Sequence, residues 1–219
     1  MKKLAIFDMD GVLVDTEPLY MQMNKEFLIQ HGYIVSEADY LGYIGISAKL
    51  MWQDLKTKAA LTQSVDELIA WEKMQKYKLL QGTDLTVIPG IPDLLSGLKS
   101  AGAKIALASS SMKKNILLIL TKTNLLSNFG YIISGEEVVF GKPHPQIFDK
   151  VLNHFSVACG EAVVVEDSTN GVEAAHAAGI YTIGFQNPNS GNQNLHLADL
   201  IIQDFNKETN REIIDVYLS

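Results

Sequence analysis

Two aspartates, Asp8 and Asp10, follow a short apolar run, Leu4–Phe7, and Gly11 comes directly after them. An apolar run of this length predicts a buried strand, so both carboxylates emerge where that strand reaches the surface. Because carboxylates this close repel each other, we expect one to hold a proton or both to share a cation. The glycine lets backbone amides approach a bound anion. This stretch therefore predicts chemistry on a charged ligand.

These acids have two simpler interpretations. Acidic side chains at strand ends often do no more than cap the following turn or helix. A calcium loop of the EF-hand type needs its glycine at the sixth position, whereas Gly11 stands at the fourth and the apolar Val12–Val14 follow it. The calcium loop is disfavoured, and a choice between capping and catalysis depends on partners elsewhere in the chain.

Polar residues end two further apolar runs. Lys104–Ala108 is followed by Ser109–Ser111, and Ala162–Val165 is followed by Glu166 and Asp167. Both runs read as buried parallel strands that give way to helical patterns. In an open α/β sheet, strand ends on one edge converge on a crevice. We therefore expect the serines and the second acid pair to meet the first acid pair in space.

A lysine supplies the positive charge that such a site needs. Lys142 lies between Gly141 and Pro143, just ahead of a helix whose first turn is marked by Pro145. Most lysines are solvated surface groups, but the glycine and proline restrict the backbone here. A nucleotide P-loop does not fit, because the spacing from Gly135 is one residue too long and Pro143 replaces the required Ser or Thr.

Together these motifs resemble those of the haloacid dehalogenase superfamily of phosphotransferases. The matching residues occur in the family's order and span nearly the whole chain: Asp8-Met-Asp10-Gly11 with Asp15, then Ser109, then Lys142, then Glu166-Asp167. Within the superfamily the chain is similar to the branch of sugar-phosphate phosphatases and β-phosphoglucomutase. The resemblance implies an α/β fold, a Rossmann-like doubly wound parallel sheet with an inserted all-helical cap domain.

The residue types suggest a role for each acid. A carboxylate that attacks a negatively charged phosphate ester needs a divalent cation, and Mg²⁺ suits an all-oxygen site. We assign Asp8 as nucleophile and metal ligand, and Asp10 as the acid and base. The resemblance adds that the backbone carbonyl of Asp10 contacts the metal. Asp167 is the remaining ligand, and Glu166 is either a ligand or a residue that orients a metal-bound water.

The phosphate group needs donors and positive charge. We expect Ser109, Ser110 and the amides that follow Ser109 to hold phosphate oxygens at the start of a helix that begins at Lys113, where unpaired amides and the helix dipole favour an anion. Lys142 would neutralise charge on the phosphate and on Asp8.

The stretch from residue 16 to residue 82 changes character. It has no β-branched runs, and apolar residues recur at helical spacing, as in Leu19, Met23 and Phe27. This pattern predicts a helical insertion, residues 16–82, within a core built from residues 1–15 and 83–219. The resemblance implies a cap that closes over the site, excludes water and selects the substrate, with a return hinge at Gly82–Asp84.

Short strands are also predicted at Tyr131–Ile133, Tyr181–Phe185 and Ile201–Ile202, with a helix between Asn170 and Ala178. The polar stretch 186–194 reads as a surface loop whose asparagines are explained by turn chemistry.

Composition limits the class of protein. With 219 residues, 47% of them hydrophobic and 20% charged, the chain has the profile of a soluble protein with a core domain and a smaller one. A net charge of -7 without a basic stripe argues against nucleic-acid binding. The first residues resemble the start of a signal peptide, but Asp8 interrupts the apolar segment too early. No apolar run is long enough to span a membrane, so we expect a cytoplasmic location. The one cysteine, Cys159, is expected to be a buried or incidental thiol.

The function predicted from the sequence is a Mg²⁺-dependent phosphatase that hydrolyses a small phosphomonoester, a sugar or polyol phosphate, through an aspartyl-phosphate intermediate. Its expected partner is a small phosphorylated metabolite, with no nucleic acid and no membrane, and the resemblance favours a monomer. A receiver-like signalling protein and a non-catalytic phosphate-binding protein are further alternatives. A receiver is disfavoured because it lacks a helical cap and carries its acceptor on a later strand.

A β-phosphoglucomutase-type mutase is the main alternative. That type carries a histidine in the first cap helix and an arginine after a Gly-x-Ser turn, and the corresponding positions here are Tyr20 and Ala48, the latter after Gly45-Ile46-Ser47. Lys49 could still reach a second phosphate. Specificity would be set by cap side chains, for which the candidates are Tyr20, Lys49, Trp52 and Lys73.

Overall fold

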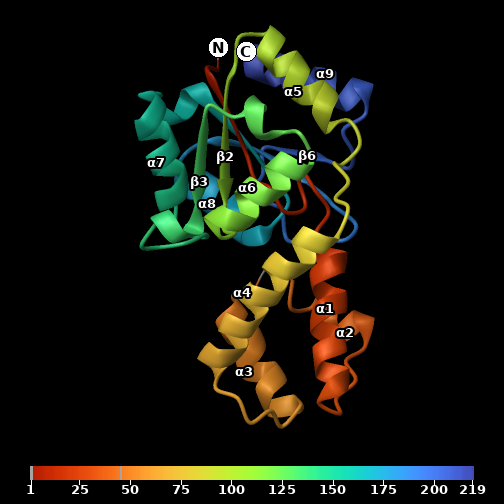
Figure 1. The fold of residues 1–219 in the computed structure, drawn as a ribbon. Helices are drawn as coiled ribbons and strands as arrows, with labels where there is room; N and C mark the ends of the chain where they lie inside the picture. Colours follow the sequence, from red (N-terminus) through yellow and green to blue (C-terminus); the bar gives the residue numbers. More distant parts are fainter. Residues whose placement is uncertain (1, 45) are drawn as a thin grey trace.

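A parallel sheet lies at the centre of the larger part of the molecule (Figure 1). The structure, a computed structural model, describes residues 2–44 and 46–219, and within them six strands form one sheet in the order β3-β2-β1-β4-β5-β6. Every pairing is parallel. The strands are β1 (Leu4–Phe7), β2 (Lys104–Ser109), β3 (Tyr131–Ser134), β4 (Ala162–Glu166), β5 (Tyr181–Phe185) and β6 (Leu200–Ile202).

Helices cover both faces of the sheet. Helices α5 (Ile91–Ser100), α6 (Lys113–Lys122) and α9 (Lys207–Leu218) pack on one face, and α7 (Gln146–Phe155) and α8 (Thr169–Ala177) pack on the other. Short 3-10 turns lie at Leu126–Asn128, Gly135–Glu137 and Cys159–Glu161. This arrangement is the doubly wound pattern, in which the carboxyl ends of the central strands form a crevice.

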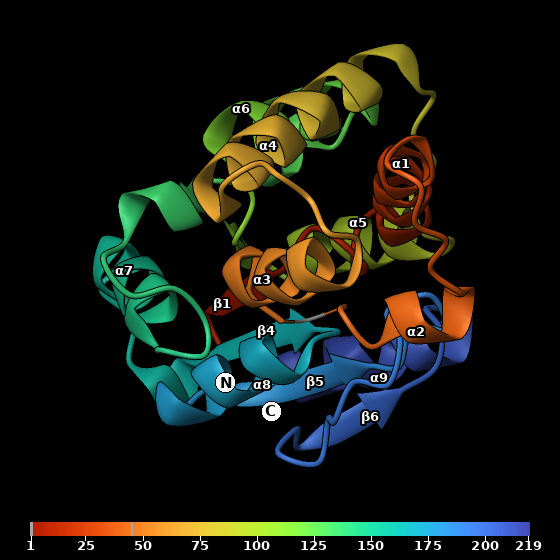
Figure 2. The same cartoon turned by 90° about the horizontal axis from the view of Figure 1, so that it is seen from below.

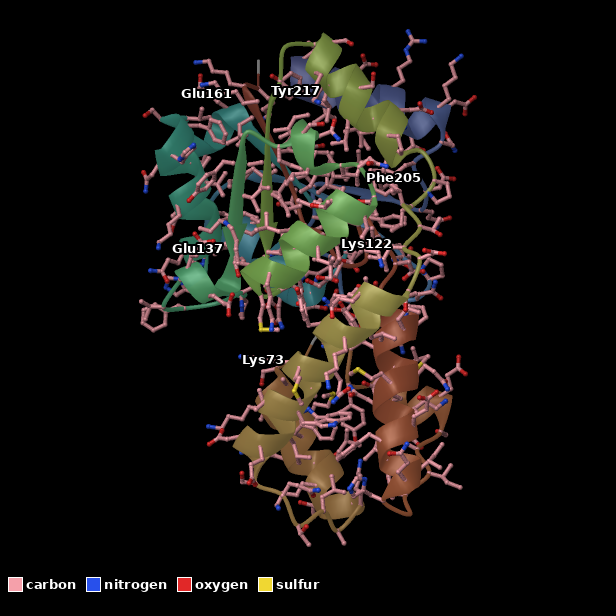
Figure 3. The ribbon with its side chains drawn as sticks, viewed as in Figure 1. Lys73, Lys122, Glu137, Glu161, Phe205 and Tyr217 are labelled. Atoms are coloured by element: carbon pink, nitrogen blue, oxygen red, sulfur yellow. The ribbon has the colours of Figure 1, made fainter. Side chains whose placement is uncertain are left out.

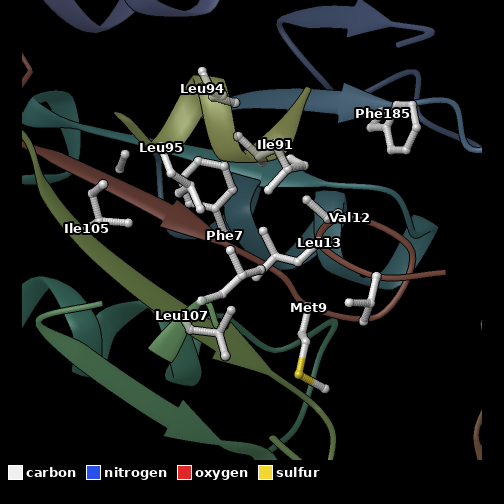
Figure 4. Close-up of a cluster of buried hydrophobic side chains, with 14 of the residues drawn as sticks. Phe7, Met9, Val12, Leu13, Ile91, Leu94, Leu95, Ile105, Leu107 and Phe185 are labelled. Carbon is white, nitrogen blue, oxygen red and sulfur yellow. The ribbon is translucent and has the colours of Figure 1, made fainter. Parts of the chain in front are cut away.

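Alternate residues of β1 serve the two hydrophobic cores. Ala5 and Phe7 join the core under α5, α6 and α9, whereas Leu4 and Ile6 join the core under α7 and α8. Figure 4 shows Phe7 among Ile91 and Leu95 of α5 and Leu107 of β2. A strand buried on both faces needs apolar residues at every position, which explains the uninterrupted run in the sequence.

The first helices form a separate unit, the cap, below the sheet in Figure 1 and in front of it in Figure 2. They are α1 (Glu17–Gln30), α2 (Glu37–Leu41), α3 (Ala48–Lys58) and α4 (Val65–Gly82). Ser36, Ser47 and Ser64 cap the last three of these helices through their side-chain oxygens. The cap has its own hydrophobic cluster, which includes Phe27, Leu55 and Leu68.

A buried carboxylate ties the cap helices together. Glu72 of α4 accepts a hydrogen bond from Trp52 Nε1 at 2.8 Å and forms an ion pair with Lys76 at 2.9 Å. Trp52 is fully buried in this cluster. Its suggested role as a specificity residue that faces the crevice is therefore wrong, because the indole packs inside the cap.

Two connections join the cap to the core side by side. Val14 bridges Val87 in antiparallel fashion, and the Ile88 amide donates to the Leu13 carbonyl at 2.9 Å. Lys122, at the end of α6, donates to the carbonyls of Leu80, Gln81 and Thr83 at 2.8, 2.9 and 2.7 Å, and it lies at this junction in Figure 3. One core lysine thus satisfies the otherwise unpaired carbonyls at the end of α4.

The predicted fold class, an α/β doubly wound sheet with an inserted helical domain, is confirmed. The exact domain boundaries at residues 15/16 and 82/83 stay a prediction. Cys159 is exposed, so of the two alternatives, a buried or an incidental thiol, the buried one is wrong. Gly45, which we placed in the Gly-x-Ser turn, lies outside the described residues. Across the described part of the chain, no helix has both the length and the apolar character to cross a membrane.

Gly90, directly before α5, should be intolerant of any side chain. Its φ is +87°, and a Cβ would lie 1.7 Å from the Phe205 carbonyl oxygen. Gly90→Ala should lower the free energy of unfolding by about 3 kcal/mol or more, measured by urea denaturation. The matched control is Gly102→Ala, with φ +81° and open space at the Cβ, which should cost about 1–2 kcal/mol. Equal losses in both variants would contradict the steric argument.

Candidate active site

The candidate catalytic residues meet at the carboxyl edge of the sheet because their strands are neighbours. Phe7 of β1 is level with Leu107 of β2 and with Val165 of β4. The residues one or two positions further on therefore emerge together. They face a cleft of about 630 Å³ between the sheet edge and the cap, and its lining includes Asp8, Asp10, Ser109, Ser110, Lys142 and Asp167.

Lys142 is the central cation of this group. Its Nζ donates to Asp8 Oδ1 at 2.6 Å, to Glu166 Oε1 at 2.5 Å and to the Ala108 carbonyl at 2.9 Å. Its side chain is only 5% exposed. Burial lowers the pKa of Lys142, but the two carboxylates raise it by more, so the net shift is upward. The interpretation as a solvated surface lysine does not apply to this chain.

The carboxylates outnumber this ammonium. Asp8, Glu166 and Asp167 each present an oxygen within 4.8 Å of the other two. Burial raises the pKa of Asp8 to about 7, although Lys142 opposes the rise. Burial, followed by the charge of Glu166, raises the pKa of Asp167 well above its usual value. A hard divalent cation would remove this repulsion, and the all-oxygen donor set suits one.

Both oxygens of Glu166 are already hydrogen bonded within the protein. Oε1 accepts from Lys142, and Oε2 accepts from the Asp167 amide at 3.2 Å, the Ser168 amide at 3.3 Å and the Ser168 hydroxyl at 3.1 Å. Gly171 makes room for it, since a Cβ there would lie 2.0 Å from the Glu166 carboxyl carbon. Of the two roles left open for Glu166, this geometry favours an orienting residue over a direct metal ligand.

Asp10 is held by two hydroxyl groups: the Ser111 contact agrees with the expectation that the serines after β2 meet the first acid pair, whereas Thr16 was not singled out in the sequence. Thr16 Oγ1 donates to Asp10 Oδ1 at 2.5 Å, and Ser111 Oγ donates to Asp10 Oδ2 at 2.7 Å. The donors lie 6 and 101 residues from Asp10, and only the fold brings the second one near. With both oxygens fixed, the carboxyl group of Asp10 is oriented toward the cleft that it lines.

The donors expected for a phosphate lie on the core side of the cleft. Ser109 is buried, and its Oγ accepts from the Ser111 amide at 3.1 Å, which leaves the hydroxyl proton for another acceptor. We expected the first amide of α6 to be free for a phosphate, but it is not: the Lys113 amide donates to Glu136 Oε2 at 2.9 Å. The anion site at the helix start is therefore limited to amides nearer Ser109.

The cap wall of the cleft carries charges of both signs. It includes Glu17, Tyr20, Glu72, Lys73 and Lys76, and Lys73 points toward the core in Figure 3. The Lys76 ammonium lies 4.4 Å from the centre of the Tyr20 ring. Burial raises the pKa of Glu17 to about 7, although Lys76 opposes the rise.

Of the proposed specificity residues, Tyr20 and Lys73 line the cleft, whereas Lys49 is exposed and is not part of the lining. Glu17 and Lys76 are additions that sequence reasoning missed. Their helical spacing gave no signal that separates them from solvated helix residues.

The loop 186–194, explained above as turn chemistry alone, also reaches the site. Ser190 Oγ donates to Asp167 Oδ2 at 2.5 Å, and Asn187 Nδ2 donates to the Gly11 carbonyl at 2.9 Å. The Asn189 side chain also donates to Asp15. Turn chemistry is thus only part of the explanation, since the loop braces Asp167 and the turn after β1.

Removal of the central cation should destabilise the fold in a pH-dependent way. Lys142→Met leaves Asp8 and Glu166 buried without a cation, and we expect a loss of about 3 kcal/mol at pH 8 in chelator. Carboxylates with raised pKa values oppose folding above those values, so the loss should shrink as the pH falls through 7. Urea denaturation at pH 8 and pH 5.5 measures the loss of stability and its dependence on pH. Lys58→Met, which removes an exposed ion pair, is the control, and a loss independent of pH would contradict the argument.

Comparisons with known proteins agree with this geometry. The family model described as haloacid dehalogenase-like hydrolase matches residues 5–185. A phosphorylated carbohydrates phosphatase of Thermotoga maritima is 34% identical over 183 residues, 82% of each chain. Hexitol phosphatase B of Escherichia coli K12 is 28% identical over 216 residues, 96% of each chain. The crystal structure of a β-phosphoglucomutase from Clostridium difficile is 25% identical, has a TM-score of 0.79 and covers 100% of this chain and 99% of its own.

The match covers most of the chain and includes every motif residue recognised in the sequence, from Asp8 to Asp167. The relatives named phosphatases support the same reaction class, a phosphoric monoester hydrolase. This chain belongs to the haloacid dehalogenase-like hydrolase family.

Proposed function

We propose that the protein is a Mg²⁺-dependent phosphatase that hydrolyses a sugar or polyol monophosphate through a phosphorylated Asp8. The observation that carries this proposal is the cluster in which Asp8 shares Lys142 with Glu166, beside Asp167 and opposite Asp10. Capping alone would not require a buried lysine and a surplus of buried carboxylates. The names of the relatives, a phosphorylated carbohydrates phosphatase and a hexitol phosphatase, support the substrate class.

Each protein group has one task in the proposed reaction. Asp8, with Oδ1 held by Lys142, attacks phosphorus with its other oxygen, and the bond from phosphorus to the ester oxygen breaks. Asp10 gives its proton to the departing alkoxide. In the second half, Asp10 takes a proton from water, the water oxygen attacks phosphorus, and the Asp8 carboxylate and inorganic phosphate are released. Thr16 and Ser111 keep Asp10 in place for both transfers.

The metal would be held by Asp8, Asp167 and the Asp10 backbone carbonyl. When bound, Mg²⁺ offsets the negative charge that Asp8 and the phosphate bring together. Glu166 would hold Lys142 and orient the water on the metal rather than bind the ion itself.

The cap wall favours a substrate whose tail is neutral and hydroxylated. Above about pH 7, where Glu17 is ionised, the carboxylates of Glu17 and Glu72 balance the ammonium groups of Lys73 and Lys76, so the wall then offers no net positive charge to a second phosphate. Carboxylates, ammonium groups and the Tyr20 hydroxyl all hydrogen bond to sugar hydroxyls. A cleft of about 630 Å³ has the size of typical small-molecule sites, so it can hold a hexose or hexitol phosphate.

A phosphosugar mutase is the second candidate, because the β-phosphoglucomutase structure superimposes over the whole chain. Such an enzyme must grip a second phosphate. Here Ala48 lines the cleft at the position expected for the arginine, and Lys49 lies outside the lining. These residues favour hydrolysis. Action as a monomer in the cytoplasm stays a prediction from the sequence.

The proposed nucleophile is tested by phosphate release from a panel that contains sorbitol 6-phosphate, hexose 6-phosphates and β-glucose 1-phosphate. We expect release with Mg²⁺, none with chelator, and none from Asp8→Asn, with circular dichroism unchanged. Asp149→Asn, an exposed acid on α7, is the control and should keep full activity. Conversion of β-glucose 1-phosphate to glucose 6-phosphate without phosphate release would establish the mutase instead, and activity in Asp8→Asn would disprove the nucleophile.

The proposed acid should matter only for leaving groups that need a proton. Asp10→Asn should lower kcat for sorbitol 6-phosphate by ~10²- to 10⁴-fold. With p-nitrophenyl phosphate the loss in the phosphorylation step should be much smaller, because nitrophenolate leaves without a proton. Burst kinetics separate that step from hydrolysis of phospho-Asp8. An equal loss in the burst rate for both substrates would show that Asp10 has a different role.

A further inference from the structure

The Gln193 side chain links the core to the cap away from Lys122, at a segment that is not part of the covalent connections. Its Oε1 accepts from the Thr169 amide in the first turn of α8 at 2.9 Å. Its Nε2 donates to the Ile44 carbonyl of the cap at 3.1 Å and to the Ser190 carbonyl at 2.8 Å. One amide group therefore uses both its acceptor and its donors, which a carboxylate or an aliphatic side chain cannot do.

The backbone beside Gln193 also touches the cap. Gly191 has φ +69°, and a Cβ there would lie 2.9 Å from the Leu41 carbonyl oxygen and 3.6 Å from Ile44 Cβ. The contact at Ile44 is thus a packed surface with a hydrogen bond inside it. A side chain at position 191 would push the two parts apart.

The cap segment held in this way faces the substrate cleft. Ile44, Ile46, Ser47 and Ala48 belong to the lining of the cleft, and so does Gln193. Among the described residues of this segment, Ile46, Ser47 and Ala48 are exposed. Local hydrogen bonds of Ile46 and Ser47 tie the segment to the cap, whereas the core holds it through the Ile44 carbonyl. Its position relative to Asp8 therefore depends on where the core holds Ile44.

The same loop reaches the candidate metal site three residues earlier. Ser190 donates its hydroxyl to Asp167 and its carbonyl accepts from Gln193. Asp167, Ser190, Gln193 and Ile44 thus form a continuous chain of hydrogen bonds from the carboxylate cluster to the cap.

We propose that Gln193 is a positioning residue that holds the Ile44–Ala48 side of the cap over the cleft and so sets the affinity for the substrate. The proposal rests on the phosphatase function above for its kinetic consequence. It does not rest on that function for the contact itself. Lys122 anchors the cap at the end of α4, and Gln193 holds it at Ile44, so loss of Gln193 would remove one of these two hydrogen-bonded anchors.

The decisive experiment is hydrogen–deuterium exchange on the full chain without ligand, comparing the wild type with Gln193→Glu. The glutamate keeps an oxygen for the Thr169 amide, but its second oxygen faces the carbonyls of Ile44 and Ser190. The Tyr43, Ile44 and Ile46 amides are hydrogen bonded within this cap segment. We expect peptides that contain them to exchange about five- to tenfold faster, with peptides of α3 and α4 unchanged.

Two further variants separate the effect of the added negative charge from the effect of losing the Gln193 hydrogen bonds. Gln186→Glu makes the same chemical change at an exposed position of the same loop and should leave exchange unchanged. Gln193→Ala removes the hydrogen bonds without adding charge and should accelerate exchange in the same peptides. Unchanged exchange in both Gln193 variants would overturn the proposal. Faster exchange throughout the protein would also overturn it, since it would indicate general destabilisation.

Kinetics then test the consequence for the substrate. With sorbitol 6-phosphate and Mg²⁺, Gln193→Ala should raise KM about tenfold and change kcat by less than twofold, since the reacting groups stay in place and no charge is added to the cleft. A fall in kcat with KM unchanged would contradict the assigned role. If the wild type released no phosphate from any substrate of the panel, the proposed function would fail while the exchange result still decided the structural claim.

Discussion

The structure depends on the burial of several carboxylates around one ammonium at the edge of the sheet. Asp8, Glu166 and Asp167 carry more negative charge than Lys142 can neutralise, and burial raises the pKa values of Asp8 and Asp167. Such a cluster is costly to fold without a cation, because desolvated like charges repel. This cost serves the proposed reaction, because it places the proposed nucleophile Asp8, Lys142 and the proposed metal ligand Asp167 close together.

The fold meets this constraint with rigid neighbours. The parallel strands β1 and β4 pair in register, so Asp8 and Glu166 emerge at the same level. Gly171 lets the Glu166 carboxylate pack against α8, and Gly11 lets Asp167 approach the turn after β1, where a Cβ would lie 2.0 Å from Asp167 Oδ2. Small residues at these two points therefore serve electrostatics as much as packing.

The cap adds what the sheet edge lacks. In the proposed reaction the core side of the cleft would hold the phosphate, and Glu17, Tyr20 and Lys76 on α1 and α4 line the part of the cleft left for the remainder of the substrate. The cap has a hydrophobic cluster of its own, while Tyr20 and Leu80 at its junction belong to the core cluster. Contacts such as those of Lys122 and Gln193 then decide how closely its wall approaches the carboxylates.

The sequence by itself determined the strands, the helical insertion and the order of the motifs. Apolar runs such as Leu4–Phe7 predict buried parallel strands, and polar residues directly after such runs must emerge at one edge of the sheet. Asp8, Ser109 and Asp167 could be identified for this reason. Their chemistry follows from residue type and from place relative to a strand, both of which are local properties of the chain.

Only the tertiary structure decided which other side chains join the site. Thr16 and Ser190 hold Asp10 and Asp167 by single hydrogen bonds, and no spacing in the sequence marks such residues. Trp52 and Lys49 were predicted to face the cleft, but neither lines it. The rotation of a helix within the cap decides whether a side chain packs inside the cap, lies in solvent or faces the cleft. Hydrogen-bond geometry and helix orientation depend on contacts between distant segments, and those contacts exist only in the folded chain.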